Sequence, residues 1–284
     1  MNIVDAHRHL WDLSRNYHPW LCNHPRIPFR YGDYQEICNN YLPEDYERDS
    51  AGYAGVGSVH IEAEWDPSDP VAETHWLDTI VPKCRHPMVV VAQVQLDGKD
   101  VESVLRAHAD SPNMRGVRHK PATSPTTHDA ERGGVGSMDD TRWRDGFAHL
   151  SNYNFSFDLQ VPFWHLAQAA ELARDFPQTT IILNHAGLPG NRDRESLTPW
   201  RDAMELLALE PNTAAKISGL GQPGQPWTVA SNFSVVRDTI SIFGVNRCMF
   251  GSNFPVDRLC ATFNDIYHGF DEIVSDYSTE DRDK

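Results

Sequence analysis

Short apolar runs alternate with longer amphipathic segments along almost the whole chain, and this alternation limits the fold more than any other feature. Runs such as VGSVHI (56–61) and MVVVAQVQL (88–96) are nearly continuous and rich in β-branched residues, which is typical of strands covered on both faces. The predicted strands are 2–6, 56–61, 88–96, 116–118, 154–160, 179–184, 213–217 and 248–251. The predicted helices between them are 43–53, 70–82, 101–109, 141–152, 164–175, 200–209, 228–243 and 261–275.

Eight strands that alternate with eight helices predict a parallel sheet joined by right-handed crossovers. If the series closes, it forms a (β/α)8 TIM-like barrel, an α/β fold for which 284 residues is an ordinary length. A doubly wound open sheet fits less well, because no glycine-rich phosphate loop follows the first apolar run. We therefore expect one barrel domain over residues 1–277, followed by a polar C-terminal tail over 278–284.

Charge and cysteine content narrow the classes of partner. A formal net charge of -15 would repel phosphate, which argues against nucleic acid and anionic membranes as partners. The five cysteines are widely spaced and form no CxxC motif, so we expect reduced thiols in a cytoplasmic protein. No secretion signal opens the chain, and its apolar stretches are too short to span a bilayer. The expected partner is a small molecule that carries carboxylate or hydroxyl groups. Assembly of the chain into a homo-oligomer is also compatible with the sequence.

Two long connections, 11–41 and 120–140, interrupt the alternation. Both follow predicted strands, where barrel enzymes place lids and substrate contacts. The alternative is that they are tolerated surface insertions. Aromatic residues in and near the first connection either form a stacking wall for a ring or pack locally; they are Trp11, Trp20, Tyr31 and Trp65.

The strongest chemical signal is the pair His7 and His9 at the end of the first predicted strand. Residues i and i+2 of a strand point to the same side, so both rings would enter the barrel mouth, about 6–7 Å apart along the chain. Two neutral imidazoles so placed can bind a divalent metal ion or polarise a carbonyl group. A third histidine, His185, ends the apolar run 181–184 and is followed by small residues that leave room for a ligand. The alternative for His185 is a core histidine with its hydrogen bonds satisfied.

Further candidates lie at the ends of other predicted strands. Glu62 alternates with His60 and Glu64, so all three side chains could point to one side of the strand. If that side faces the barrel interior, Glu62 is a candidate base or extra metal ligand. If it faces outward, Glu62 is an exposed charge. Arg118, with His119 beside it, can hold a substrate carboxylate in a bidentate manner, and the alternative is an internal salt bridge. Lys216 can bind substrate as a point charge or pair with Asp158 or a glutamate.

Four motifs in order along the chain carry a resemblance to a known family. They are DAHRHLWD (5–12), NHAGLP (184–189), KISGL (216–220) and MFGSNFPVD (249–257). With them the chain resembles the amidohydrolase-2 family, in the branch that holds sugar-acid lactonases and 2-pyrone-4,6-dicarboxylate lactonase. The resemblance implies a distorted (β/α)8 barrel that hydrolyses a lactone or a related ester. It also implies a site built from His7, His9, His185 and a carboxylate after the last strand, with one zinc ion in some relatives and no metal in others.

One position departs from the family pattern, because the last-strand aspartate of the relatives aligns with Asn253. A carboxamide cannot act as a base, although Asn253 can orient water or bind weakly through its oxygen. Asp257 is the nearby carboxylate, and its alternative role is the N-cap of the last helix. The base is therefore either Asp257 or Glu62.

These residues favour a metal-dependent hydrolase that opens a small lactone derived from a sugar acid or an aromatic breakdown product. His7, His9 and His185 would bind one divalent ion, with zinc favoured, or polarise the carbonyl directly. Arg118, Lys216 and His119 would contact the substrate. A metal-dependent decarboxylase of a hydroxy-aromatic acid is the alternative, and a barrel that binds a metabolite without turnover is the third reading.

Overall fold

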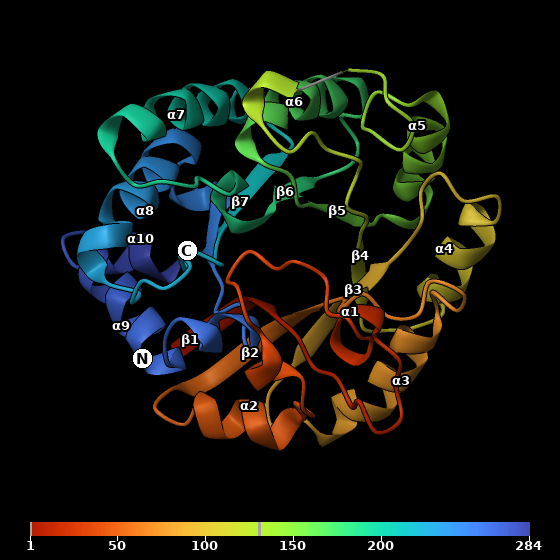
Figure 1. Cartoon of the computed structure of the whole chain (residues 1–284), viewed down its shortest axis with the longest axis horizontal. Coiled ribbons are helices and arrows are strands. Elements are labelled where there is room, and N and C mark those ends of the chain that lie inside the picture. The colour runs from red at the N-terminus through yellow and green to blue at the C-terminus, as the bar shows by residue number, and fades with distance from the viewer. Residues whose placement is uncertain (1, 130–131) are drawn as a thin grey trace.

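The computed structural model describes residues 2–129 and 132–284. Its centre is a sheet of eight strands, each hydrogen-bonded in parallel to the next along the chain (Figure 1). The strands are β1 (Asn2–Arg8), β2 (Ala54–Ile61), β3 (Met88–Gln93), β4 (Met114–Arg118), β5 (Ser156–Leu159), β6 (Ile181–Leu183), β7 (Thr213–Ile217) and β8 (Cys248–Phe250). The predicted parallel series is confirmed, and Thr213–Ile217 has the predicted bounds.

The barrel closes where the first strand meets the segment after the last one. Arg8 forms a parallel bridge with Phe254. The backbone N–H of Asn253 donates to the His7 carbonyl oxygen (2.7 Å), and the backbone N–H of His9 donates to the Phe254 carbonyl oxygen (2.8 Å). The two ends of the sheet are thus joined by backbone hydrogen bonds, as a TIM-like (β/α)8 barrel requires.

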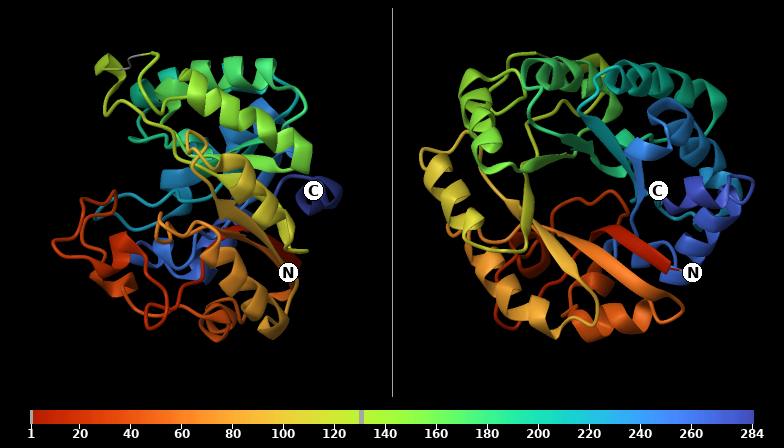
Figure 2. Two further views of the ribbon diagram at one scale, coloured as in Figure 1. Left: turned by 90° about the vertical axis from the view of Figure 1, so that its right-hand side faces the viewer. Right: turned by 180° about the vertical axis from the view of Figure 1, so that it is seen from behind.

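Helices surround the sheet, as the view from behind shows (Figure 2). They are α2 (Pro43–Asp49), α3 (Ala72–Ile80), α4 (Val101–Ala109), α5 (Thr141–Ala148), α6 (Leu166–Asp175), α7 (Arg194–Ala208), α8 (Val229–Phe243) and α9 (Phe263–Ile273). The shorter α1 (Pro19–Cys22) lies in the first long connection, and α10 (Thr279–Asp283) lies in the polar C-terminal tail. Among the described residues, no helix combines the length and the apolar character needed to cross a bilayer.

The largest difference from the predicted elements is the start of α7. The sequence places this helix at 200–209, after Pro199, but it begins at Arg194 and carries Pro199 inside. The Asp193 side chain accepts a hydrogen bond from the Ser196 amide (2.9 Å) and caps the first turn. The cap and the burial of Leu197 and Trp200 outweigh the hydrogen bond that a proline cannot donate.

The first long connection folds back over the carboxyl ends of the strands (Figure 1). Trp11 and Tyr41 close it with two reciprocal backbone hydrogen bonds of 2.9 and 3.0 Å. Inside it, Trp11 is fully buried and its indole donates to the Asn39 carbonyl (2.7 Å). The connection is therefore an ordered cover over the barrel mouth. The second connection, 120–140, lies outside the described residues at 130–131, and its described part is closed by a hydrogen bond from the Ala122 amide to the Gly136 carbonyl (2.8 Å).

Candidate active site

Three histidines from opposite sides of the barrel meet at its mouth. The ring centroids of His7 and His9 are 5.2 Å apart, and those of His7 and His185 are 4.5 Å apart. His7 is the last residue but one of β1 and is fully buried, and His185 lies two residues after the end of β6. The structure thus brings together all three histidines that the sequence singled out.

All three rings are held in the neutral form. Burial lowers the pKa of His7 well below its ordinary value, and the neighbouring His185 and Lys216 lower it further. Burial also lowers the pKa of His9, with Arg118 and His60 adding to the effect. For His185, burial acts together with Arg30 and Arg118. Neutral imidazoles keep a lone pair, which is what a cation or a hydrogen-bond donor on a ligand needs.

Two of the rings are oriented by fixed partners. His9 donates from Nδ1 to the Ile61 carbonyl oxygen (2.8 Å), which leaves the lone pair on Nε2. His185 places Nδ1 3.0 Å from the Ser218 hydroxyl. Neither ring nitrogen of His7 has a hydrogen-bond partner among the described residues, although the side chain is fully buried. An unpaired buried imidazole is costly, so His7 is the ring that most needs a ligand.

Left-handed backbone conformations aim several of these side chains. His185 has φ of 55°, Glu64 has φ of 55° and Asn253 has φ of 56°. Non-glycine residues seldom adopt this region, and such conformations cluster at functional sites. Each of these residues follows a strand, so the turn directs its side chain across the barrel mouth.

Close packing between β8 and β1 fixes His7. A Cβ added to Gly251 would lie 2.7 Å from the His7 Cβ and 2.9 Å from its amide nitrogen, so only glycine fits there. Asp5 accepts hydrogen bonds from the amide and the hydroxyl of Ser252 (2.8 and 2.6 Å) and from the Tyr46 hydroxyl (2.9 Å). Asp5 therefore ties the first motif to the last, a role that sequence reasoning missed.

A buried carboxylate lies beside the histidines. Asp257 accepts at Oδ1 from the Asn253 amide nitrogen (2.6 Å) and from the Tyr31 hydroxyl (2.8 Å). Burial raises the pKa of Asp257 to about 6, although Arg30, Asn253 and Tyr31 lower it. Burial lowers the pKa of His9, and the Asn253 side chain opposes this effect. The helix-cap role weighed for Asp257 is wrong, because Thr262 caps α9.

Arg30 is a functional candidate that no sequence pattern indicates, because it lies in the middle of the first long connection. Its Nη2 is 4.0 Å from Asp257 Oδ1, and its guanidinium stands 4.6 Å from the centre of the Tyr31 ring. A Cβ on Gly219, which has φ of +60°, would lie 2.7 Å from Arg30 Nη2 and 2.4 Å from His185 Nδ1. The glycine therefore lets a cation and an imidazole approach each other at the mouth.

Glu62 and Arg118 form a buried ion pair at the ends of β2 and β4. Arg118 donates from Nε to Glu62 Oε1 (2.5 Å), from Nη2 to the Glu62 carbonyl (2.6 Å) and from Nη1 to Gln160 (3.2 Å). Burial would raise the pKa of Glu62, but Arg118 and Lys120 outweigh burial and lower it. A paired carboxylate with a lowered pKa is a weak base, so this geometry favours Asp257 over Glu62 in that role. Substrate binding by Arg118 stays a prediction.

We expect Arg118→Met to lower the free energy of unfolding by about 3–5 kcal/mol, because it leaves the Glu62 charge buried without a partner. Both side chains are nearly inaccessible, at 3% and 4% exposure. Chemical denaturation would measure the change, with the double variant Glu62→Gln/Arg118→Met as control. The double variant should recover part of the loss, and equal losses in both proteins would show that the ion pair is not the cause.

Two other predicted substrate contacts have protein partners. Lys216 forms an ion pair with Asp158 inside the barrel, and Asp158 also accepts from Asn184 (2.7 Å). The interior pairing that was weighed for Lys216 is therefore the observed arrangement. His119 accepts at Nδ1 from the Leu96 amide (3.1 Å) and from the Trp143 indole (3.0 Å), which places its proton on Nε2.

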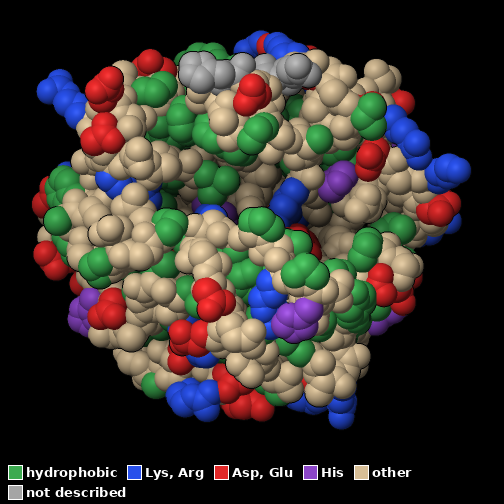
Figure 3. All heavy atoms as spheres, viewed as in Figure 1, with side chains coloured by type: hydrophobic (Ala, Val, Ile, Leu, Met, Phe, Trp, Pro, Cys, Tyr) green, Lys and Arg blue, Asp and Glu red, His purple; other side chains and the backbone are tan. Residues whose placement is uncertain are grey.

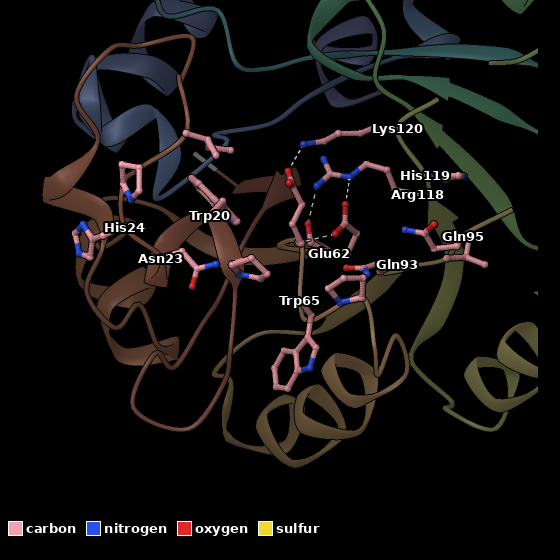
Figure 4. Close-up of a pocket in the computed structure, with 16 residues that line it drawn as sticks. Trp20, Asn23, His24, Glu62, Trp65, Gln93, Gln95, Arg118, His119 and Lys120 are labelled. Carbon is pink, nitrogen blue, oxygen red and sulfur yellow. Dashed lines mark hydrogen bonds and ion pairs between the residues drawn. The ribbon is translucent and has the colours of Figure 1, made fainter. Parts of the chain in front are cut away.

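A cavity of about 580 Å³ opens over the ends of β2, β3 and β4 (Figure 4). The space-filling view of this face shows a central hollow in which basic side chains gather (Figure 3). Two ion pairs, Arg118–Glu62 and Lys120–Glu64, stand at the edge of the cavity. The lining residues are Pro19, Trp20, Asn23, His24, Pro25, Ile27, Glu62, Glu64, Trp65, Pro67, Gln93, Val94, Gln95, Arg118, His119 and Lys120.

The donor set suits one divalent cation. Three neutral imidazoles converge, and the buried His7 ring has no other partner among residues 2–129 and 132–284. Within the same residues, no group of three or more His, Cys, Asp or Glu side chains already has the arrangement of a metal site. The three side chains therefore suit a divalent cation because their neutral imidazole nitrogens are good metal ligands.

Comparisons with known proteins cover the whole chain. The model of the amidohydrolase family matches residues 4–284. The protein y4mH of Sinorhizobium fredii is 38% identical over 99% of this chain and 94% of its own length. An L-fucono-1,5-lactonase of Burkholderia ambifaria is 26% identical over 92% of this chain and 83% of its own length.

Solved structures share the fold. A zinc-bound amidohydrolase from Burkholderia multivorans superposes with a TM-score of 0.78 at 21% identity, over 100% of this chain and 95% of that one. A probable 2-pyrone-4,6-dicarboxylic acid hydrolase from Acinetobacter baumannii, with citric acid bound, gives 0.67 at 15% identity, over 99% and 95%. A 2,6-dihydroxybenzoate decarboxylase from Rhizobium gives 0.62 at 14% identity, over 99% and 95%. At these identities the likeness concerns the fold alone.

Proposed function

The chain belongs to the amidohydrolase family, and we propose that this hydrolase opens the ring of a small lactone or a related cyclic ester by adding water. The observation that carries the proposal is a buried carboxylate, Asp257, whose pKa is raised to about 6 beside three neutral imidazoles. The L-fucono-1,5-lactonase similarity and the fold of the 2-pyrone-4,6-dicarboxylic acid hydrolase support a lactone derived from a sugar acid or an aromatic catabolite.

Asp257 supplies the proton transfer that ring opening needs. A base with a pKa of about 6 is ionised at neutral pH and still strong enough to accept a proton from water. After Asp257 accepts a proton from water, the remaining hydroxide adds to the acyl carbon of the lactone. The ring C–O bond then breaks, and the proton moves from Asp257 to the departing ring oxygen. Asn253 and Tyr31 hold Oδ1 by hydrogen bonds, so Oδ2 is the oxygen that accepts the proton.

The histidines and Arg30 complete the site. A divalent ion held by His7, His9 and His185 would polarise the lactone carbonyl and acidify the attacking water. Zinc suits three imidazole ligands and an open position, and catalysis without metal is the alternative within this proposal. Arg30 lies beside His185 and would attract the carboxylate that forms when the ring opens.

A hydrolysis assay on protein of known metal content tests the proposal. Aldono-1,5-lactones and 2-pyrone-4,6-dicarboxylate would be supplied, and released acid would be followed with a pH indicator after subtraction of the uncatalysed rate. We expect one equivalent of acid for each lactone and no CO2. Release of CO2 would identify a decarboxylase, and saturable binding without turnover would identify a metabolite-binding barrel.

Metal binding makes a separate prediction. After incubation with zinc and gel filtration, the unmodified protein should retain about one ion per chain, and His7→Ala should retain several-fold less, because three ligands are needed for a tight site. His268→Ala, on the exposed side of α9, is the matched control. Metal content would be read by elemental analysis, and equal retention in all three proteins would contradict the assignment.

A further inference from the structure

The 580 Å³ cavity is displaced from the proposed reaction centre. Its lining comes from the first long connection and from the ends of β2, β3 and β4, and it includes neither the three histidines nor Asp257. The link between the two places is the end of β2. His9 donates to the Ile61 carbonyl oxygen (2.8 Å), and the next residue, Glu62, lines the cavity together with Arg118, which donates to the Glu62 carbonyl oxygen (2.6 Å). A substrate with its carbonyl at the histidines would therefore extend past Arg118 into the cavity.

One side of the cavity is a rigid aromatic surface. Trp20 donates from its indole to the Ala63 carbonyl (2.9 Å) and stacks on Phe29, with ring centroids 5.6 Å apart. Trp65 packs against His18, with ring centroids 5.2 Å apart. Ile27 adds an apolar side chain that is 54% exposed at the edge. These groups offer flat apolar contact at low entropic cost.

The other side of the cavity carries glutamine side-chain amides and charged side chains that are already paired with each other (Figure 4). Gln93 and Gln95 line it, and the Gln93 amide oxygen is buried with no hydrogen-bond partner among the described residues. Amides both donate and accept, which suits hydroxyl groups. Arg118 and Lys120 are already paired with Glu62 and Glu64, so the cavity favours a neutral group over an anionic one.

From this combination we infer that the cavity binds a sugar ring attached to the lactone. The C–H face of a sugar packs on an indole, and its hydroxyls pair with amides. A cavity within the usual ligand range of about 300–1,000 Å³ also exceeds what a single lactone ring fills. This inference rests on the proposed function and defines its substrate class as a glycosylated aldonolactone.

Paired substrates test the inference. We expect kcat/KM for cellobiono-1,5-lactone to exceed that for glucono-1,5-lactone at least about tenfold, because binding energy from the remote ring is used at the reacting one. Trp65→Ala should lower this ratio about tenfold. Gln95→Trp, which fills the cavity from an exposed position, should lower it as well. Tyr153→Ala removes a half-buried aromatic side chain before β5, at the opposite end of the barrel, and should keep the ratio.

Calorimetry separates this inference from the proposed function. Cellobionate should bind at least about tenfold more tightly than gluconate, whether or not any lactone is opened. If cellobionate binds in this way and no lactone is opened, the proposed function fails and the sugar site stands. Equal kcat/KM for the two lactones and equal binding of the two acids would overturn the inference. A second pair of lactones tests an aromatic substituent: dihydrocoumarin carries a fused benzene ring, and δ-valerolactone does not. If kcat/KM shows a preference only within this pair, the inference is overturned in favour of an aromatic substituent.

Discussion

Asp257→Asn is expected to lower kcat/KM for lactone opening by about 10²–10⁴-fold, the usual contribution of a positioned general base. The amide has the same shape as the carboxyl group but cannot accept the proton of water. The closest charged partner of Asp257 is Arg30, at 4.0 Å, so the loss of charge breaks no tight ion pair. Steady-state kinetics at pH 7.5 would measure the loss, and circular dichroism would confirm the fold.

Asp276→Asn provides the matched control, because it makes the same change in an exposed ion pair with Arg237 on the outer surface. Its kcat/KM should equal that of the unmodified protein. If Asp257→Asn keeps more than a tenth of the activity, Asp257 is not the base. Loss of activity in Glu62→Gln under the same conditions, with the fold intact, would instead assign the role to Glu62.

Asn253→Asp is expected to move the acid limb of the pH–rate profile upward by at least about one unit, because two carboxylates in contact cannot both ionise easily. The Asn253 amide nitrogen lies 2.6 Å from Asp257 Oδ1 and now donates to it. A carboxylate at this position would repel Asp257 or share its proton. At pH 6.5 the variant should therefore be at least about threefold slower, and it should recover as the pH rises.

The pH profile distinguishes this effect from simple damage to the site. Asn253→Ala removes a hydrogen bond that lowers the pKa of Asp257 but adds no charge, so its acid limb should move upward less than that of Asn253→Asp. If Asn253→Asp turns over faster at pH 6.5, the aspartate at this position acts as the base, as in the relatives that Asn253 departs from. The geometry around Asn253 would then suit a base at that position, and Asp257 would not be the base.

The order of the strands and the place of the histidines could be predicted because both follow from local patterns. Continuous apolar runs predicted all eight strands, and a histidine after a strand must lie at the barrel mouth. The predicted start of α7 at residue 200 is wrong, because the cap at Asp193 and tertiary packing decide where the helix begins and carry it through Pro199. Patterns in a short stretch of sequence do not show tertiary contacts of this kind.

Asp158 was named in advance as a possible partner of Lys216, but other partners of charged residues could not be predicted, for a similar reason. Arg118 pairs with Glu62 across 56 positions, and Asp257 meets Tyr31 across 226 positions. The first contact depends on which sides of β2 and β4 face the barrel interior. The second depends on how the long connection folds over the barrel, and the sequence of that connection has no periodic pattern. Arg30 was missed because a single arginine in an irregular segment gives no signal until its neighbours in space are known.

The pH dependence of lactone opening by the unmodified protein tests the central claim most directly. Burial raises the pKa of Asp257 to about 6, and the base must be ionised to act. kcat/KM should therefore rise about tenfold per unit well below pH 6 and become level above it, with one equivalent of acid released per lactone. A rate that is flat from pH 4.5 to 8, or product that appears as CO2, would contradict the account.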